Sequence, residues 1–177
     1  MRVVSGKYRG RKIYPPKKFH SRPTTDFAKE SLFNILEHQL EWEAFKVLDL
    51  FAGSGSISVE FLSRGAASVL SVDKHPKVIQ HLHQLKSEFN DENWSISRAD
   101  VFQFIEKSPQ SFDLIFADPP FGMKQMDELV DRVLNSTILS DEGLFILEHG
   151  GEHQFENHPQ FTKTKNYGGV NFTFFER

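Results

Sequence analysis

From Lys46 onward, short apolar runs alternate with segments of helical periodicity, and this alternation limits the fold more than any other feature. Each run is five or six residues long, as is typical of strands buried on both faces of a parallel sheet. Helices between such strands lead to right-handed crossovers. The sequence therefore predicts a doubly wound, Rossmann-like α/β fold. The runs occupy residues 47–51, 68–72, 94–98, 112–117 and 143–148.

The last part of the chain has a different periodicity. Residues 161–167 and 170–175 alternate with period two around Gly168-Gly169, which predicts a β-hairpin. The sheet should therefore end in antiparallel strands and contain seven strands, most of them parallel. With 177 residues the chain is expected to form one domain, residues 1–177, with a sizeable core.

Two elements are predicted near the N-terminus. Val3-Val4 and Lys12-Ile13-Tyr14 flank a glycine-bearing loop and predict a small β-hairpin. Thr25 or Asp26 is expected to be the N-cap of the helix that follows. The buried stripe of this helix is expected to comprise Phe27, Ala28, Leu32, Phe33, Ile35 and Leu36.

Cations are concentrated at the N-terminus. Residues 1–25 contain eight Lys and Arg and no Asp or Glu, whereas residues 26–177 contain 13 cations and 24 acids. A basic arm on an acidic body indicates a polyanionic partner, such as RNA, bound by the arm. Charge alone leaves a solvated, mobile terminus as an equal alternative. The glycines Gly6 and Gly10 and the pair Pro15-Pro16 favour a shaped, RNA-binding arm.

Composition excludes several classes of protein. No apolar run approaches the ~20 residues of a membrane helix, and no signal-peptide core follows Met1. The chain has no cysteine, which excludes disulfides and thiolate metal sites and favours a cytoplasmic enzyme. No metal site is expected either. His81 and His83 face different directions on a helix, and His149 and His153 lack a convincing third ligand.

A glycine-rich loop follows the first predicted strand. Gly53 and Gly55 lie between that strand and a helix, where glycine permits a sharp turn and a close approach to a ligand. The third glycine of a dinucleotide fingerprint is absent, because Ser58 occupies its position. The loop therefore fits a cofactor without a pyrophosphate better than it fits NAD.

Acidic residues lie at the ends of the first three predicted strands. Asp73, about twenty residues after the glycines, suits a bidentate contact to ribose hydroxyls, although a helix N-cap is an equal alternative. Asp100 is a candidate partner for an adenine amino group. Asp49 either faces an amine of the cofactor or is a buried carboxylate that caps nearby backbone. Together the three acids indicate a cofactor site more specifically than any one of them does.

A second loop, Asp118-Pro119-Pro120-Phe121, follows the run 112–117 and should lie at the same edge of the sheet. An amine conjugated to an aromatic base is a poor nucleophile, and acceptors aimed at its N–H bonds favour its attack on a methyl group. The Asp118 carboxylate and the Pro119 carbonyl supply such acceptors, and the prolines hold them rigidly. Phe121 offers a face for a flipped-out base. A rigid turn without function is the weaker alternative.

The two loops resemble the cofactor and catalytic loops of S-adenosylmethionine-dependent amino-methyltransferases. Across nearly the whole chain, the pattern is similar to the bacterial 16S rRNA guanine-N2 methyltransferase family of the RsmD type. The matching stretches are residues 2–6, 9–11, 22–26, 32–36, 49–55, 60, 63–66 and 118–121.

The resemblance implies that a class I methyltransferase methylates one guanine N2 in 16S ribosomal RNA, with S-adenosylmethionine as methyl donor. It further implies a substrate within a partly assembled small ribosomal subunit, and we expect a monomer. The catalytic residues would be Asp118, Pro119, Pro120 and Phe121. Cofactor contacts would come from Asp49, Phe51, Gly53, Gly55, Asp73, Asp100 and Thr24, and RNA contacts from Arg9, Arg11, Lys12, Arg22 and Pro23. Within the chain, residues 1–25 would be the RNA-binding arm and residues 26–177 the catalytic body.

The chain departs from the family pattern at three positions. Asp73 stands where the family commonly has Glu, and His75 and Leu85 stand where it often has an acid and Asn. Two other functions remain open. An adenine-N6 methyltransferase of DNA or RNA uses the same loop logic but usually needs a separate target-recognition region. A non-catalytic RNA-binding assembly factor on the same fold would have no need of the strand-end acids.

Overall fold

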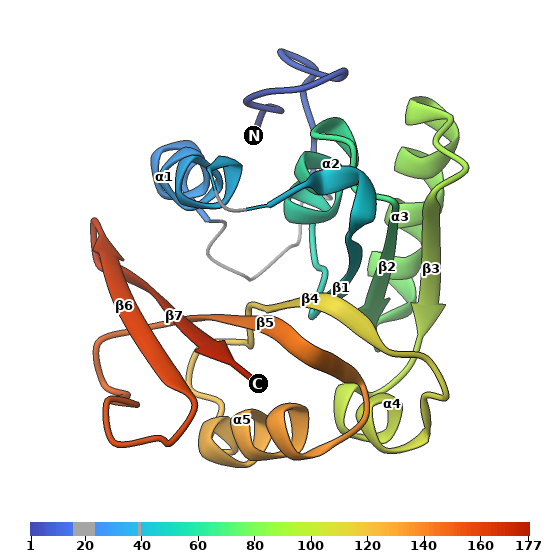
Figure 1. Cartoon of the computed structure of the whole chain (residues 1–177). Helices are drawn as coiled ribbons and strands as arrows, with labels where there is room; N and C mark the ends of the chain where they lie inside the picture. The colour runs from blue at the N-terminus through green and yellow to red at the C-terminus, as the bar shows by residue number, and fades with distance from the viewer. Residues whose placement is uncertain (16–23, 39) are drawn as a thin grey trace.

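The computed structural model describes residues 1–15, 24–38 and 40–177. A seven-stranded sheet with strand order β3-β2-β1-β4-β5-β7-β6 lies at its centre (Figure 1). Strands β1 to β5 are parallel, and β7 runs antiparallel to both of its neighbours, as predicted. The strands are β1 Lys46–Leu50, β2 Ser68–Asp73, β3 Trp94–Arg98, β4 Phe112–Ala117, β5 Leu139–His149, β6 Phe161–Tyr167 and β7 Val170–Glu176.

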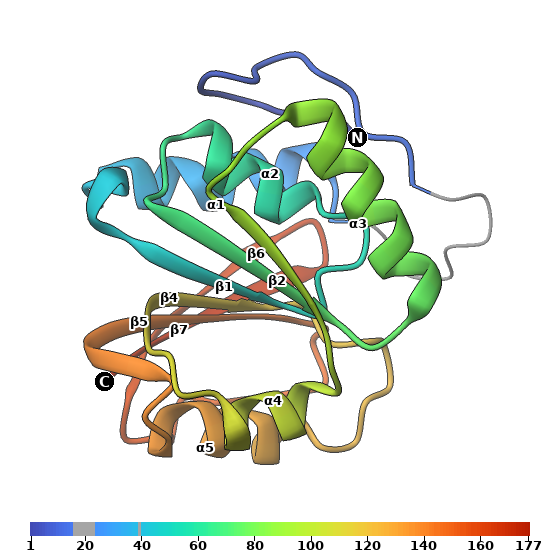
Figure 2. The same cartoon turned by 90° about the vertical axis from the view of Figure 1, so that its right-hand side faces the viewer.

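Helices cover both faces of the sheet (Figure 2). Helices α1 Asp26–Glu37, α2 Ser56–Ser63 and α3 Pro76–Phe89 lie on one face, and α4 Val101–Lys107 and α5 Met126–Asn135 lie on the other. A short 3₁₀ turn, Trp42–Ala44, precedes β1. The buried apolar side chains form two clusters, one on each face of the sheet. No helix in the described part of the chain is long and apolar enough to cross a membrane.

Helix α1 begins as predicted but buries a different set of residues. The Thr25 side chain accepts a hydrogen bond from Ala28 N at 3.1 Å and is therefore the N-cap. The predicted stripe is wrong at Phe27, whose ring is 64% exposed, while Lys29 is almost fully buried. Lys29 is accommodated because its Nζ donates to Arg2 O at 2.6 Å and to Ser56 Oγ at 2.9 Å.

The N-terminal segment pairs with itself less extensively than predicted. Arg2 and Lys12 form one isolated antiparallel bridge in place of two strands. The segment is nevertheless fixed to the body, because the Glu60 carboxylate accepts Val4 N at 2.9 Å and Ser5 N at 3.0 Å. Glu60 is itself buried between Lys29 and Arg64, which contact it at 3.7 and 3.1 Å. The segment is therefore a docked turn and not a loose tail.

Candidate active site at the carboxyl edge of the sheet

The glycine loop lies at the end of β1, where the prediction put it. Phe51, Gly53 and Gly55 all have positive φ values, of 60°, 51° and 75°, so the backbone folds back on itself before α2. Gly55 cannot be replaced without rearrangement, since a Cβ there would lie 2.7 Å from Leu82 Cδ2. Leu85 Cδ1 would lie 3.3 Å from this Cβ. Leu85, one of the three departures from the family pattern, therefore packs against the loop.

Asp73 braces the glycine loop from the end of β2. Its Oδ2 accepts Gly53 N at 3.2 Å, and its Oδ1 accepts His75 N at 2.9 Å. The N-cap of α3 is His75, which makes no side-chain capping bond, so Asp73 is not the N-cap residue itself. Each Asp73 oxygen retains further acceptor capacity. Its position fits the predicted ribose contact, and its two backbone bonds orient the carboxylate.

Asp100, by contrast, is a helix N-cap. Its Oδ1 accepts Phe102 N at 3.1 Å and Gln103 N at 3.3 Å, and these bonds begin α4. The side chain thus has a structural role that the sequence prediction did not include. It still lies at the end of β3, in the row of strand ends that also contains Asp73.

Asp49 is buried at the end of a chain of hydrogen bonds. Trp94 Nε1 donates to Ser71 Oγ at 2.7 Å, Ser71 and Ser58 Oγ lie 2.6 Å apart, and Ser58 Oγ donates to Asp49 Oδ2. Because Trp94 can only donate, the hydroxyl protons point in turn toward the carboxylate. Ser58, which replaces the third glycine of a dinucleotide fingerprint, is the residue that contacts Asp49. Burial raises the pKa of Asp49 to about 7, with a smaller contribution from Asp73.

The Asp118 loop lies directly beside the glycine loop. Asp118 N donates to Leu50 O at 3.4 Å, which joins the two loops at the ends of β4 and β1. Met123 N donates to Pro120 O at 3.1 Å and closes the turn. At the tip of the loop the Phe121 ring is 93% exposed, and at the base of the loop Pro119 is buried. The loop therefore holds a free aromatic face on a fixed backbone.

Glu148 is a candidate site residue that the sequence prediction missed. Ala117 pairs with Leu147 in the parallel β4–β5 ladder, so the next residues, Asp118 and Glu148, are neighbours on one face. Glu148 is 7% exposed, and its Oε2 accepts the Thr24 hydroxyl at 2.7 Å. Its place at the end of the apolar run Phe145–Leu147 is the signal that could have identified it.

The carboxyl groups of Asp49, Asp118 and Glu148 lie on this face, and the charge of one disfavours ionisation of its neighbours. Burial, followed by the charges of Glu148 and Asp49, holds the pKa of Asp118 well above its usual range. Burial likewise raises the pKa of Glu148 to about 7, although its bond from Thr24 opposes the shift. The prediction did not anticipate that Thr24 would contact an acid. This contact ties the start of α1 to the acid beside Asp118.

The cations of the basic arm divide into two groups. Lys7 Nζ pairs with Asp91 at 2.9 Å, and the Arg11 guanidinium lies 3.8 Å from the centroid of the Phe89 ring and donates to Glu88 O at 2.8 Å. These two side chains therefore dock the arm on α3 and its C-terminal end. Arg9 and Lys12 are exposed, and no ion pair of either is found within the described residues. The predicted residues Arg22 and Pro23 lie outside the described part of the chain.

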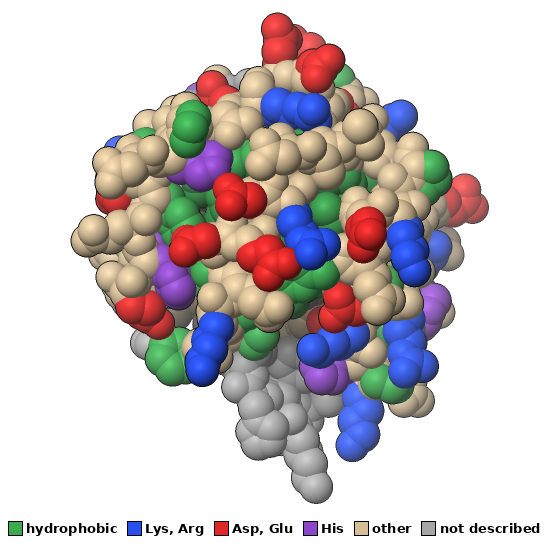
Figure 3. All heavy atoms as spheres, turned by 90° about the horizontal axis from the view of Figure 1, so that it is seen from below, with side chains coloured by type: hydrophobic (Ala, Val, Ile, Leu, Met, Phe, Trp, Pro, Cys, Tyr) green, Lys and Arg blue, Asp and Glu red, His purple; other side chains and the backbone are tan. Residues whose placement is uncertain are grey.

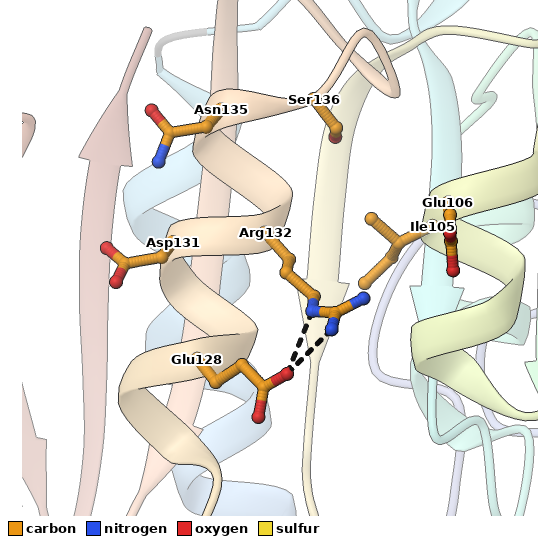
Figure 4. Close-up of a pocket in the computed structure, with 7 residues that line it drawn as sticks. All are labelled: Ile105, Glu106, Glu128, Asp131, Arg132, Asn135 and Ser136. Atoms are coloured by element: carbon orange, nitrogen blue, oxygen red, sulfur yellow. Dashed lines mark hydrogen bonds and ion pairs between the residues drawn. The ribbon is translucent and has the colours of Figure 1, made fainter.

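The hollow between α4 and α5 and the histidines do not form a second candidate active site. A hollow between α4 and α5 is lined by Ile105, Glu106, Glu128, Asp131, Arg132, Asn135 and Ser136 (Figure 4). Arg132 is held there by Glu128 at 2.8 Å, within one helix. Among the described residues, no group of three or more potential ligands could hold a metal ion. His149 instead contacts Gly150 O and Thr173 Oγ1, each at 2.7 Å.

Comparisons with known proteins agree with this arrangement. A family model described as "Conserved hypothetical protein 95" matches residues 1–176. The chain belongs to this family. Ribosomal RNA small subunit methyltransferase D of Haemophilus influenzae is 34% identical to it, over 84% of this chain and 78% of that protein. The predicted relationship to the RsmD-type methyltransferases is confirmed.

Solved structures show the same fold. The putative methyltransferase yhhF from Escherichia coli has a TM-score of 0.88 and 29% identity, and the match covers 100% of this chain and 97% of that one. The Thermus thermophilus 16S rRNA N2 G1207 methyltransferase, solved in complex with AdoMet and guanosine, has a TM-score of 0.70 and 22% identity. That match covers 89% of this chain and 45% of the Thermus chain. The chain therefore has the predicted class I methyltransferase fold.

Proposed function

We propose that this protein transfers a methyl group from S-adenosylmethionine to the exocyclic N2 amine of a guanine in small-subunit ribosomal RNA. One observation carries the proposal. The Asp118-Pro119-Pro120-Phe121 loop lies beside the glycine loop, joined to it by the bond from Asp118 N to Leu50 O at 3.4 Å. The name and the 34% identity of the Haemophilus influenzae relative support ribosomal RNA as substrate.

The residues of the glycine loop fit S-adenosylmethionine. Gly53 carries no side chain, so a ligand can approach the backbone closely there, whereas Gly55 allows the loop to pack against Leu82 and Leu85. The oxygens of Asp73 can each accept a ribose hydroxyl in addition to one backbone N–H. The buried carboxyl of Asp49, whose pKa lies near 7, favours a cationic partner such as the amino group of the cofactor. When bound, the cofactor supplies an electrophilic methyl group.

Asp118 and Pro119 would hold the acceptor amine. The guanine N2 lone pair is delocalised into the base, and hydrogen bonds from its two N–H groups to the Asp118 carboxylate and the Pro119 carbonyl direct that lone pair outward. The cofactor would supply the methyl carbon to which N2 bonds, and the bond that breaks would be the one from this carbon to sulfur. The ionised Asp118 stabilises the positive charge that develops on N2. Its raised pKa also makes it a stronger base than an ordinary carboxylate, which suits it to accept the N2 proton afterwards.

Phe121 and the exposed cations would position the RNA. The 93% exposed Phe121 ring can stack on the flipped guanine, and Arg9 and Lys12 can contact phosphates. We further propose that the enzyme is a monomer and that it acts in the cytoplasm on partly assembled small subunits. Within the chain, residues 1–25 would bind RNA and residues 26–177 would carry out catalysis, as a single domain.

The deciding experiment uses methyl-labelled cofactor and substrates from cells that lack the protein. Naked 16S RNA, partly assembled subunits and mature subunits are each incubated with the enzyme, and the RNA is then digested to nucleosides. Labelled N2-methylguanosine is expected, and the Asp118→Ala variant should produce far less of it. Labelled N6-methyladenosine would identify an adenine methyltransferase instead. A folded protein that binds RNA but neither the cofactor nor its demethylated product would be a non-catalytic assembly factor.

A further inference from the structure

An aromatic pair, the exposed Phe27 and the half-buried Tyr167, lies at the carboxyl edge of the sheet, outside the proposed catalytic loops. The Phe27 ring, in the first turn of α1, contacts Tyr167 at the end of β6 edge-to-face, with 6.1 Å between centroids. Phe27 is 64% exposed, because it lies off the buried face of α1. Thr24, three residues earlier, contacts Glu148 beside Asp118.

Two lysines lie on the same face of β6 as Tyr167. Lys163, Lys165 and Tyr167 alternate along the strand, and their partners in β7 are Phe174, Phe172 and Val170. Lys163 Nζ lies 4.9 Å from the centroid of the Phe174 ring. Within the described residues, neither lysine forms an ion pair. We call Phe27, Lys163, Lys165 and Tyr167 the α1–β6 patch.

The sheet topology places this patch at the same edge as the methyltransferase loops. Strands β5 and β6 both pair antiparallel to β7, so they run in the same direction and their carboxyl ends lie at one edge. Asn171 of β7 pairs with His149 on one side and with Asn166 on the other. Tyr167 is thus level with the end of β5, which carries Glu148.

Charge distinguishes this segment from the rest of the body. Residues 157–175 contain two lysines and no Asp or Glu, although residues 26–177 as a whole have 11 more acids than cations. The face over α4 and α5 looks different, because acids and cations are interspersed there among the described residues (Figure 3). An acid-free strand whose lysines form no ion pair within the described residues fits a polyanion, and the exposed Phe27 ring fits an unstacked base.

We propose that the α1–β6 patch is a second RNA-binding surface. It would hold the single-stranded nucleotides next to the target guanine, with Phe27 stacked on a base and Lys163 and Lys165 against phosphates. This inference rests on the proposed function. The N-terminal arm and the patch would then contact the RNA at separate places, one over α2 and α3 and one at β6.

The test compares two charge-matched double variants of the full-length protein. In the first, Lys163→Gln and Lys165→Gln are combined in the patch. In the second, Lys46→Gln and Lys107→Gln remove two exposed lysines, at the start of β1 and the end of α4. Binding of protein-free 16S RNA is measured over a salt series. The patch variant should flatten the log–log slope by about 0.7–0.9 for each lost phosphate contact, and the control should leave the slope nearly unchanged.

Aromatic variants test the stacking contact separately. Phe27→Leu should weaken RNA binding by about 5- to 150-fold, the range for one lost base stack, while Phe27→Tyr should bind nearly as wild type does. Cofactor binding should be the same in all variants, which shows that they are folded.

Three results would overturn the inference. The first is an equal salt slope for the two lysine variants together with wild-type RNA affinity in Phe27→Leu. If the wild type still methylates its substrate, this result leaves the proposed function intact. Wild-type binding of protein-free RNA combined with weakened binding of subunits would identify a protein partner at the patch instead. A wild-type protein that neither binds nor methylates ribosomal RNA would overturn the inference and the proposed function together.

Discussion

Replacement of Asp49 by Asn should stabilise the protein at neutral pH but not in acid. Asp49 is 2% exposed, and burial raises the pKa of its carboxyl from 3.8 to about 7. A carboxyl whose pKa is raised by folding contributes stability below its unfolded pKa, and this contribution is lost as the pH rises through its folded pKa. For Asp49 the loss falls between about pH 4 and about pH 7.

The size of the effect follows from the same shift. A difference of about three pKa units corresponds to about 4 kcal/mol of unfolding free energy, which is an upper bound. Asn matches Asp in size and can still accept the Ser58 hydroxyl, but its buried amide N–H groups lack a known partner. That defect costs about 1–3 kcal/mol at every pH. We therefore expect the variant to be less stable than wild type near pH 4 and to gain up to about 4 kcal/mol relative to it by pH 8.

Urea unfolding of both proteins, from pH 4 to pH 8 and followed by tryptophan fluorescence, measures this change. The control is Asp141→Asn, because the Asp141 side chain is fully exposed and its replacement removes a charge that is not buried. The quantity that matters is the difference in unfolding free energy between variant and wild type. If that difference stays constant across the range, Asp49 is not held in an environment that penalises its charge, and the electrostatic account of this edge is wrong.

Four further outcomes are expected. Asp118→Ala should leave cofactor affinity nearly unchanged but lower single-turnover methyl transfer by about 10²-fold or more, and near-normal rates would contradict its role. Glu148→Gln should lower the pKa of Asp118, so the acid limb of kcat/KM against pH should move to lower pH; an unmoved limb would rule out the coupling. Lys29→Met should cost about 3 kcal/mol in urea unfolding, because it leaves Glu60 buried with one cation fewer. Neutralising Arg9 and Lys12 together should reduce the salt dependence of RNA binding and leave cofactor binding unchanged.

The sheet was predictable because burial on both faces leaves a plain signal. A strand inside a doubly wound sheet has helices above and below it, so nearly every residue is apolar and the run is short. The carboxyl-edge rule then identified the glycine loop and the Asp118 loop as neighbours, and the bond from Asp118 N to Leu50 O joins them. The extra residues at the start of β5 were missed because the run is interrupted by Ser140, Asp141 and Glu142, the last with a φ of 61°.

The error at α1 has a geometric cause. Ala28, Leu32 and Leu36 recur every four residues and define the buried face, and Phe27 lies about 100° away from Ala28 around the helix. Phe27 is apolar, but its angular position on the helix, and not its residue type, decides its exposure. Lys29 shows the opposite pattern. Its position on the helix predicts burial, whereas its charge predicts exposure. Only the tertiary partners Arg2 O, Ser56 and Glu60 make that burial tolerable.

The arm illustrates why composition alone cannot assign cations to a ligand. Lys7 and Arg11 were counted among eight cations without a local acid, yet Asp91 and the Phe89 ring, about 80 residues away in the chain, engage them. Sequence distance hides such partners. Glu148 shows the reverse limit, because a strand-end acid after β5 was visible by the same reasoning that selected Asp49, Asp73 and Asp100.

The carboxyl groups at this edge are electrostatically unfavourable neighbours. Asp49, Asp118 and Glu148 all have raised pKa values, and burial is the largest cause for each. A fold gains nothing from such an arrangement by itself, since buried carboxyls without cations reduce stability at neutral pH. A ligand that brings positive charge reverses this penalty, and S-adenosylmethionine carries both a sulfonium and an ammonium group. The same carboxyl groups therefore favour the cationic cofactor over its product, whose sulfur is uncharged, and this difference would assist product release after each methyl transfer.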